Sequence, residues 1–88
     1  PYTKMRNGKY IVDGKMNLED FCELFSLNYD EIETEYVTIG GYCIELLDDN
    51  FAKLGNVIKL KNLSMKVIAI DKKNTIEKLL VTVNKPID

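Results

Sequence analysis

The sequence predicts one α+β domain in which two helices pack on a small, mainly antiparallel sheet. The chain has 88 residues, which is enough for one hydrophobic core and too few for two. Hydrophobic residues make up 45% of it and charged residues 30%, which is the balance of a folded protein rather than a disordered one. Two segments with helical periodicity precede three β-rich segments, and this grouping favours an α+β fold.

The first strand is expected close to the N-terminus. Residues 1–8 form a polar lead, and residues 9–12 then read as a short strand because three of them are β-branched or aromatic. Asp13 and Gly14 follow directly, and this pair is typical of tight turns. We therefore assign Asp13 and Gly14 to a structural turn that ends the strand.

The first helix is predicted to begin after Asn17. Asn is among the best N-capping residues, and Glu19 and Asp20 occupy the first turn, where the helix dipole favours negative charge. Apolar side chains then recur at the spacing of one helix face: Leu18, Phe21, Cys22 and Phe25. Residues 28–36 carry four acids and no base, so we interpret them as a surface connection.

The second helix is predicted to begin after Thr38, another good N-cap, and to end at the polar run 48–50. Its apolar face comprises five residues: Ile39, Tyr42, Cys43, Leu46 and Leu47. Gly40 and Gly41 fall in its first turn, where each costs up to about 1 kcal/mol of helix propensity relative to Ala. Such a cost needs a packing or binding reason, and close packing of the helix on the sheet is the default.

The last third of the chain is predicted to form a three-stranded antiparallel meander. Residues 57–61, 63–70 and 75–83 alternate or run apolar in β-favouring residue types, with polar turns between them. Pro86 cannot donate to a sheet ladder, so the last strand should end before it and leave a short tail, residues 85–88. Together these elements place the domain at residues 9–84.

A further structural turn is expected at Gly55, ahead of the meander. Charge differs strongly between residues 1–50 and residues 51–88. Residues 1–50 hold eleven acids and four bases, whereas residues 51–88 hold eight lysines and three acids. This predicts an acidic helical half beside a sheet edged with lysines, which protect exposed strands from pairing with other chains. The isoelectric point of about 5.1 makes nucleic acid a poor partner.

The two cysteines, Cys22 and Cys43, are interpreted as free thiols in a reducing compartment. They are too few and too far apart for a zinc knuckle or a C-x-x-C redox motif. Both fall on predicted apolar helix faces, where a free cysteine usually serves as a small core residue. Catalysis by either thiol is not expected.

Catalytic and metal chemistry is not expected either. The chain contains no histidine, which is the usual general base and the commonest transition-metal ligand. The acidic pairs at 30–31 and 48–49 do not match the spacing of an EF-hand and are expected to be solvated. We predict no catalytic residue, no metal site and no enzyme activity.

No apolar run approaches the roughly 18–20 residues that a bilayer span needs, so we expect this fragment to be soluble and not to insert into a membrane. The start at Pro1, without an initiator Met, suggests a piece of a larger protein.

Four short patterns in order carry a resemblance to a known family. They are Tyr-Ile-Val-Asp-Gly at 10–14, Asn-Leu-Glu-Asp-Phe at 17–21, Thr-Ile-Gly-Gly-Tyr-Cys-Ile-Glu-Leu-Leu at 38–47 and Leu-Gly at 54–55. This order resembles the CorC/HlyC transporter-associated domain, in which a V-D-G turn, a T-[LIV]-[AG]-G helix start ending in E-L-L and a glycine turn follow one another. The resemblance covers about residues 9–84.

The resemblance implies a non-catalytic regulatory domain at the C-terminus of a larger protein. Its expected partners are a pair of CBS domains and, in many members, a transmembrane domain linked to magnesium and cobalt efflux. Some members are called haemolysins. The expected location is the cytoplasmic side of the cell membrane. The family fold is also similar to part of the PCMH-type FAD-binding fold, so FAD or an adenine nucleotide enters as a cofactor by fold analogy alone.

Two further hypotheses remain open. The first is a sensor for an adenine or flavin nucleotide, in which Thr38, Gly40 and Gly41 form the site and free N–H groups of the helix start meet a phosphate. Three acids nearby in sequence oppose an anion there: Glu33, Glu35 and Glu45. The second is a homodimerisation module, because apolar strands such as residues 79–81 must cover their edges and at least one face.

Overall fold

The computed structural model describes residues 1–84, so the predicted tail at 85–88 lies outside the described residues. One antiparallel sheet has the strand order β1-β2-β5-β4-β3. Its strands are β1 (Tyr2–Lys4), β2 (Lys9–Asp13), β3 (Val57–Leu60), β4 (Leu63–Ile70) and β5 (Ile76–Val83). The helical elements are α1 (Leu18–Leu24), the short 3-10 helix η1 (Tyr29–Glu31) and α2 (Ile39–Leu46).

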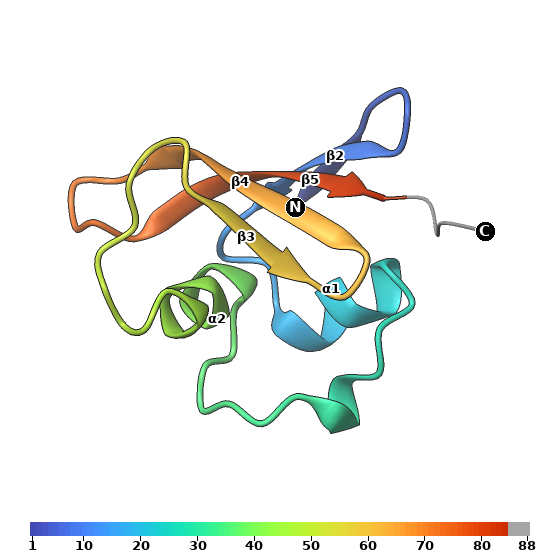
Figure 1. The fold of residues 1–88 in the computed structure, drawn as a ribbon, viewed down its shortest axis with the longest axis horizontal. Helices are drawn as coiled ribbons and strands as arrows, with labels where there is room; N and C mark the ends of the chain where they lie inside the picture. The colour runs from blue at the N-terminus through green and yellow to red at the C-terminus, as the bar shows by residue number, and fades with distance from the viewer. Residues whose placement is uncertain (85–88) are drawn as a thin grey trace.

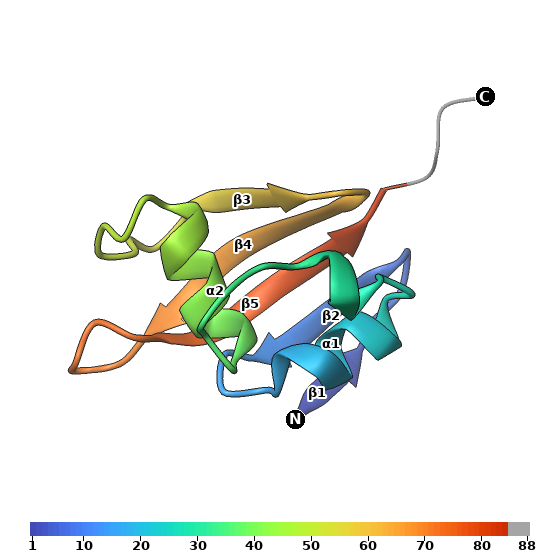
Figure 2. The same ribbon diagram turned by 90° about the horizontal axis from the view of Figure 1, so that it is seen from below.

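Both helices lie on the same face of the sheet (Figure 1). Seen from the helix side, α1 lies over the end of the sheet formed by β1 and β2, and α2 crosses the middle strands (Figure 2). The predicted α+β class, with two helices on an antiparallel sheet, is therefore confirmed.

The predicted meander is present as β3, β4 and β5, but it is only part of the sheet. Strand β2 pairs with β5, the last strand. Residues 9–13 and 78–82 therefore lie side by side although most of the chain separates them. The expected polar lead at residues 1–8 contains strand β1, in which Tyr2 pairs with Val12 and Lys4 with Tyr10. The lead is therefore part of the sheet.

The core lies between the helices and alternate residues of the strands. One row of side chains crosses the sheet through Val12, Leu79 and Val67, none of which is more than 1% exposed. The next row runs through four strands: Tyr10, Val81, Met65 and Ile58. Because side chains alternate between the two faces of a strand, this register buries one face and leaves the other open.

The open face carries the intervening residues. One row consists of Ile11, Leu80, Lys66 and Val57, and the next contains Lys9 and Lys59. Lysines thus lie on the face away from the helices, whereas most of the acids belong to the helices and their connections. Strand β5 is central, and of residues 79–81, which suggested self-association, Leu79 and Val81 are buried within the chain, whereas Leu80 lies half-buried on the open face. Self-association stays a prediction.

The helices begin as predicted. The side chain of Asn17 accepts hydrogen bonds from the backbone N–H groups of Glu19 (2.8 Å) and Asp20 (3.3 Å), and Thr38 caps α2. The predicted apolar face of α2 is wrong at its end: Leu46 is 37% exposed, because the helix ends there and Leu47 serves as its C-cap.

Both cysteines are free and buried, as predicted. Burial raises the pKa of Cys43 to about 12. Burial, followed by the charge of Glu19, raises the pKa of Cys22 as well. Both thiols are therefore protonated at neutral pH. Since it is the thiolate that reacts, the two cysteines are unreactive and act as small apolar core residues.

None of the helices in residues 1–84 is long and apolar enough to cross a membrane.

Candidate functional site

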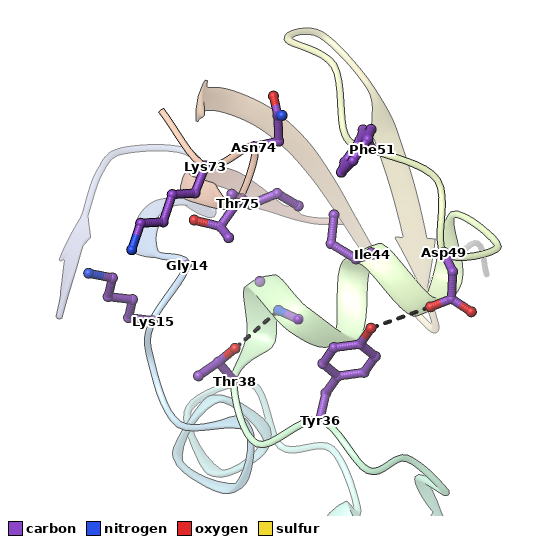
Figure 3. Close-up of a pocket in the computed structure, with 13 residues that line it drawn as sticks. Gly14, Lys15, Tyr36, Thr38, Ile44, Asp49, Phe51, Lys73, Asn74 and Thr75 are labelled. Carbon is purple, nitrogen blue, oxygen red and sulfur yellow. Dashed lines mark hydrogen bonds between the residues drawn. The ribbon is translucent and has the colours of Figure 1, made fainter. Parts of the chain in front are cut away.

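A cavity of about 430 Å³ opens where α2 begins (Figure 3). Residues from four segments line it: the turn after β2, the start of α2 with the residues before it, the connection from α2 to β3, and the loop between β4 and β5. The candidate ligand residues Thr38, Gly40 and Gly41 all line this cavity, and so does the turn residue Gly14. Gly55 does not line it and lies in a turn with a φ of 89°.

Close backbone contact between three segments forms the floor of the cavity. The N–H of Gly40 donates to the carbonyl oxygen of Gly14 at 2.8 Å, and the N–H of Gly14 donates to the carbonyl of Glu77 at 2.9 Å. A Cβ added at Gly40 would lie 2.7 Å from the oxygen of Gly14, and one added at Gly14 would lie 2.0 Å from the oxygen of Ile76. Close packing of helix on sheet therefore explains Gly40, as the sequence predicts.

The first N–H groups of α2 already have partners within the chain. Ile39 donates to the carbonyl of Met16 at 3.0 Å, Gly40 donates to Gly14, and Gly41 donates to the Thr38 hydroxyl oxygen at 3.1 Å. A helix start normally leaves such groups unpaired, and the phosphate hypothesis relied on that. In this fold they are occupied, so any ligand of the cavity must be held by other atoms.

Two lysines from loops distant in sequence lie on one side of the cavity, Lys15 from the turn after β2 and Lys73 from the loop between β4 and β5 (Figure 3). The turn is fixed by a hydrogen bond of 2.9 Å from the Lys15 N–H to Asp13 Oδ1. The sequence analysis missed both lysines as site residues. The only sequence signal was that each follows a turn-forming aspartate.

Asp71 fixes the loop that carries Lys73. Its Oδ1 accepts hydrogen bonds from the N–H groups of Lys73 (2.8 Å) and Thr75 (3.0 Å), and its Oδ2 accepts one from the Thr75 hydroxyl. The hydrogen bonds from Thr75 chiefly lower the pKa of Asp71, with a smaller contribution from the charge of Lys15. The carboxylate is thus ionised at neutral pH, and both of its oxygens are engaged by its own loop.

An aromatic and acidic side lies across the cavity from the lysines (Figure 3). The Tyr36 hydroxyl donates to Asp49 Oδ1 at 3.4 Å. Partial burial, followed by the charge of Asp49, raises the pKa of Tyr36, so this hydroxyl remains a donor at neutral pH. Phe51 forms part of the wall and is 74% exposed.

Acidic residues continue beyond Tyr36. Glu35 and Glu45 line an adjoining hollow together with Tyr36 and Asp49. The Thr34 hydroxyl donates to Glu45 Oε1 at 2.9 Å. Two of the three acids expected to repel an anion therefore lie next to the Tyr36 side of the cavity, and the lysines lie on the other side.

Within residues 1–84, no group of three or more histidine, cysteine, aspartate or glutamate side chains is placed to hold a metal ion.

The family model of the CorC_HlyC transporter associated domain matches residues 3–85 of the chain. No curated protein matches the chain. Among solved structures, the transporter associated domain of a Xylella fastidiosa Temecula1 hemolysin, in complex with Mg²⁺ and Mn²⁺, has a TM-score of 0.79 at 20% identity. The alignment covers 96% of this chain and 98% of that one.

Two other structures are equally similar. The transporter associated domain of a CBS domain protein from Porphyromonas gingivalis has a TM-score of 0.80 at 19% identity and covers 97% of this chain and 99% of that one. The region associated with a candidate Mg²⁺ and Co²⁺ transporter (CorC) from Neisseria meningitidis MC58 has a TM-score of 0.81 at 21% identity, covering 93% and 96%. The structures show the same fold, the family model spans nearly the whole chain, and the chain belongs to the CorC/HlyC transporter-associated domain family.

Proposed function

We propose that this domain is a non-catalytic regulatory part of a membrane-anchored protein with CBS domains, and that it modulates the transport of divalent cations. The observation that carries the proposal is the family match over residues 3–85, which leaves almost no part of the described chain for a different role. The proposed partners are the CBS and transmembrane domains of the same protein.

The similar structures support this direction. One comes from a CBS domain protein, one is tied by its name to a candidate Mg²⁺ and Co²⁺ transporter, and one was solved with Mg²⁺ and Mn²⁺. Divalent cations are therefore the first cargo to test.

The chemistry of the side chains also favours a regulatory role. The two thiols are the strongest nucleophiles that the chain could offer, and burial holds both of them protonated. The cavity at the start of α2 holds lysines, an aspartate, a tyrosine and apolar side chains. These groups suit recognition of a ligand better than bond cleavage, because none of them forms a nucleophile and base pair.

The test removes residues 1–84 from the full-length parent protein and measures Mg²⁺ and Co²⁺ efflux from cells. The deletion begins at residue 1 because β1 belongs to the sheet. We expect transport to persist, with at least about a twofold change in its rate or in its dependence on intracellular Mg²⁺. Immunoblots of membrane fractions provide the control, since the truncated and intact parents must be present at equal levels. Equal efflux with equal Mg²⁺ dependence would contradict the proposal.

A further inference from the structure

We propose that the cavity at the start of α2 binds an adenine nucleotide, with its phosphate between Lys15 and Lys73, its base against Phe51 and its amino group on Asp49. This inference deepens the regulatory function proposed above and rests on it for its biological meaning, because it names the signal that the domain would read. Binding itself can be tested on the isolated chain.

The size of the cavity fits one nucleotide. Its volume of about 430 Å³ lies within the roughly 300–1,000 Å³ typical of small-molecule sites. The floor is made partly of Gly14, Gly40 and Gly41, so the ligand would lie against backbone atoms there. The walls add apolar surface from Ile44 and Phe51.

The lysine side of the cavity fits the phosphate. Within residues 1–84, the single ion pair joins Lys61 to Glu31, at 3.9 Å, so neither Lys15 nor Lys73 has a carboxylate in contact. The charge of Asp71 is close enough to interact with Lys15, but both of its oxygens accept hydrogen bonds from its own loop. Two ammonium groups with their loops already fixed are therefore available to a doubly charged phosphate monoester.

The aromatic wall fits the base. Phe51 is 74% exposed although it lines a cavity, so a large part of its ring has no partner in the chain. Tyr36 is 38% exposed on the same side. Stacking on exposed aromatic rings is a common means of holding nucleobases, because every base presents a flat π surface.

The acidic side selects the kind of base. Asp49 Oδ1 accepts a hydrogen bond from Tyr36, which leaves Oδ2 as an acceptor for a donor on the ligand. The exocyclic amino group of adenine is such a donor, whereas hypoxanthine presents a carbonyl oxygen at the same position. Glu35 and Glu45 lie beyond Asp49 and disfavour a phosphate at this end, so the orientation of the nucleotide is fixed.

The test is an NMR titration of the isotopically labelled 88-residue chain with AMP, IMP, adenosine, ribose 5-phosphate and FAD, at constant low salt. We expect saturable shifts with AMP in the amides of residues 14–15, 49–51 and 73–75. IMP, adenosine and ribose 5-phosphate should each bind at least about fivefold more weakly, because IMP lacks the amino group, adenosine lacks the phosphate, and ribose 5-phosphate lacks the base with both of its contacts. Binding of FAD with the same shifts would extend the ligand to the dinucleotide, and its failure to bind would restrict the site to mononucleotides.

Three variants separate the contacts. Lys73→Ala should lower the affinity for AMP at least about fivefold and leave the affinity for adenosine unchanged, because only AMP carries the phosphate. Phe51→Ala should lower the affinities for AMP and adenosine by the same factor, because both ligands carry the base. Asp49→Asn should remove the discrimination between AMP and IMP; Asn suits this position because Asp49 has a φ of 60° and Asn tolerates the left-handed region. The matched control is Lys59→Ala, which removes a lysine from the open face of the sheet.

Three outcomes would overturn the inference: no saturable shift at millimolar AMP, shifts centred on the open sheet face, or a loss of AMP affinity in Lys59→Ala equal to that in Lys73→Ala. Each would leave the deletion experiment on the parent protein unaffected, so the inference and the proposed function can fail separately.

Discussion

Gly14→Ala is expected to cost the domain about 3 kcal/mol or more of its unfolding free energy, which is most of the stability of a chain this size. The added Cβ would lie 2.0 Å from the carbonyl oxygen of Ile76 and 2.8 Å from its carbonyl carbon. Both atoms belong to the backbone at the start of β5, the central strand, so the clash cannot be relieved by turning a side chain. The turn after β2 or the start of β5 would have to move, and α2 is docked on that turn through Gly40.

Urea unfolding followed by circular dichroism measures this loss. The control is Gly55→Asn. Gly55 has a φ of 89°, but no atom lies within 4 Å of an added Cβ, and Asn is the residue that best tolerates such a conformation after Gly. The unfolding free energy of this control should stay within about 1 kcal/mol of that of the unsubstituted chain. Equal stabilities of Gly14→Ala and the control would show that the close contact between Gly14 and β5 does not exist in solution.

Gly40→Ala and Gly41→Ala are expected to differ although the two residues are neighbours in one helical turn. Helix propensity alone predicts that each substitution stabilises the chain by up to about 1 kcal/mol. At Gly40 the new Cβ would lie 2.7 Å from the oxygen of Gly14, a backbone atom, so we expect a net loss of about 2 kcal/mol. At Gly41 the nearest atom, at 2.5 Å, is on the ring of Tyr36, which is 38% exposed and can turn away.

For Gly41→Ala we therefore expect a change of less than about 1 kcal/mol of either sign. The same urea measurement compares the pair, and each variant is the control for the other because the propensity gain is shared. Two stabilised variants would mean that α2 does not pack on Gly14 as the structure has it.

The parts of the fold that depend on local sequence could be predicted. Asn17 and Thr38 act as N-caps because their side chains reach backbone groups only two or three residues away. Strand β4 has the predicted bounds, because apolar and polar residues alternate over 63–67 and an apolar run continues from there to residue 70. The family patterns follow the same local features, which explains why the resemblance and the fold agree.

The parts that depend on distant contacts could not be predicted. Strand β1 has no buried residue, so its sequence carries no alternation, and only pairing with β2 makes it a strand. The pairing of β2 with β5 joins Val12 to Leu79, and no local signal marks such a contact. The apolar spacing continues into Leu46 and Leu47, but α2 ends at Leu46, which is exposed, and Leu47 is its C-cap.

The candidate site shows the same division. The low helix propensity of Gly40 and Gly41 indicated that a packing or binding contact requires glycine there. Only the fold shows that, for Gly40, this contact is with the carbonyl of Gly14. Lys15 and Lys73 are separated by most of the chain, and the turns that hold them bring them to one cavity. Phe51 follows a polar run and fits no period, so its place in the wall has no signature in the sequence.

Amide hydrogen exchange by NMR tests the central claim most directly, namely that the start of α2 is docked on the turn at Gly14 and is not an open helix terminus. The N–H group of Gly40, the second residue of α2, donates to the backbone carbonyl of the buried residue Gly14, whereas that of Glu19, the second residue of α1, donates only to the exposed Asn17 side chain. We predict that the Gly40 amide exchanges at least about a hundredfold more slowly than the Glu19 amide, after correction for intrinsic rates. Equally fast exchange at both positions would contradict the docked helix start and, with it, the cavity built around it.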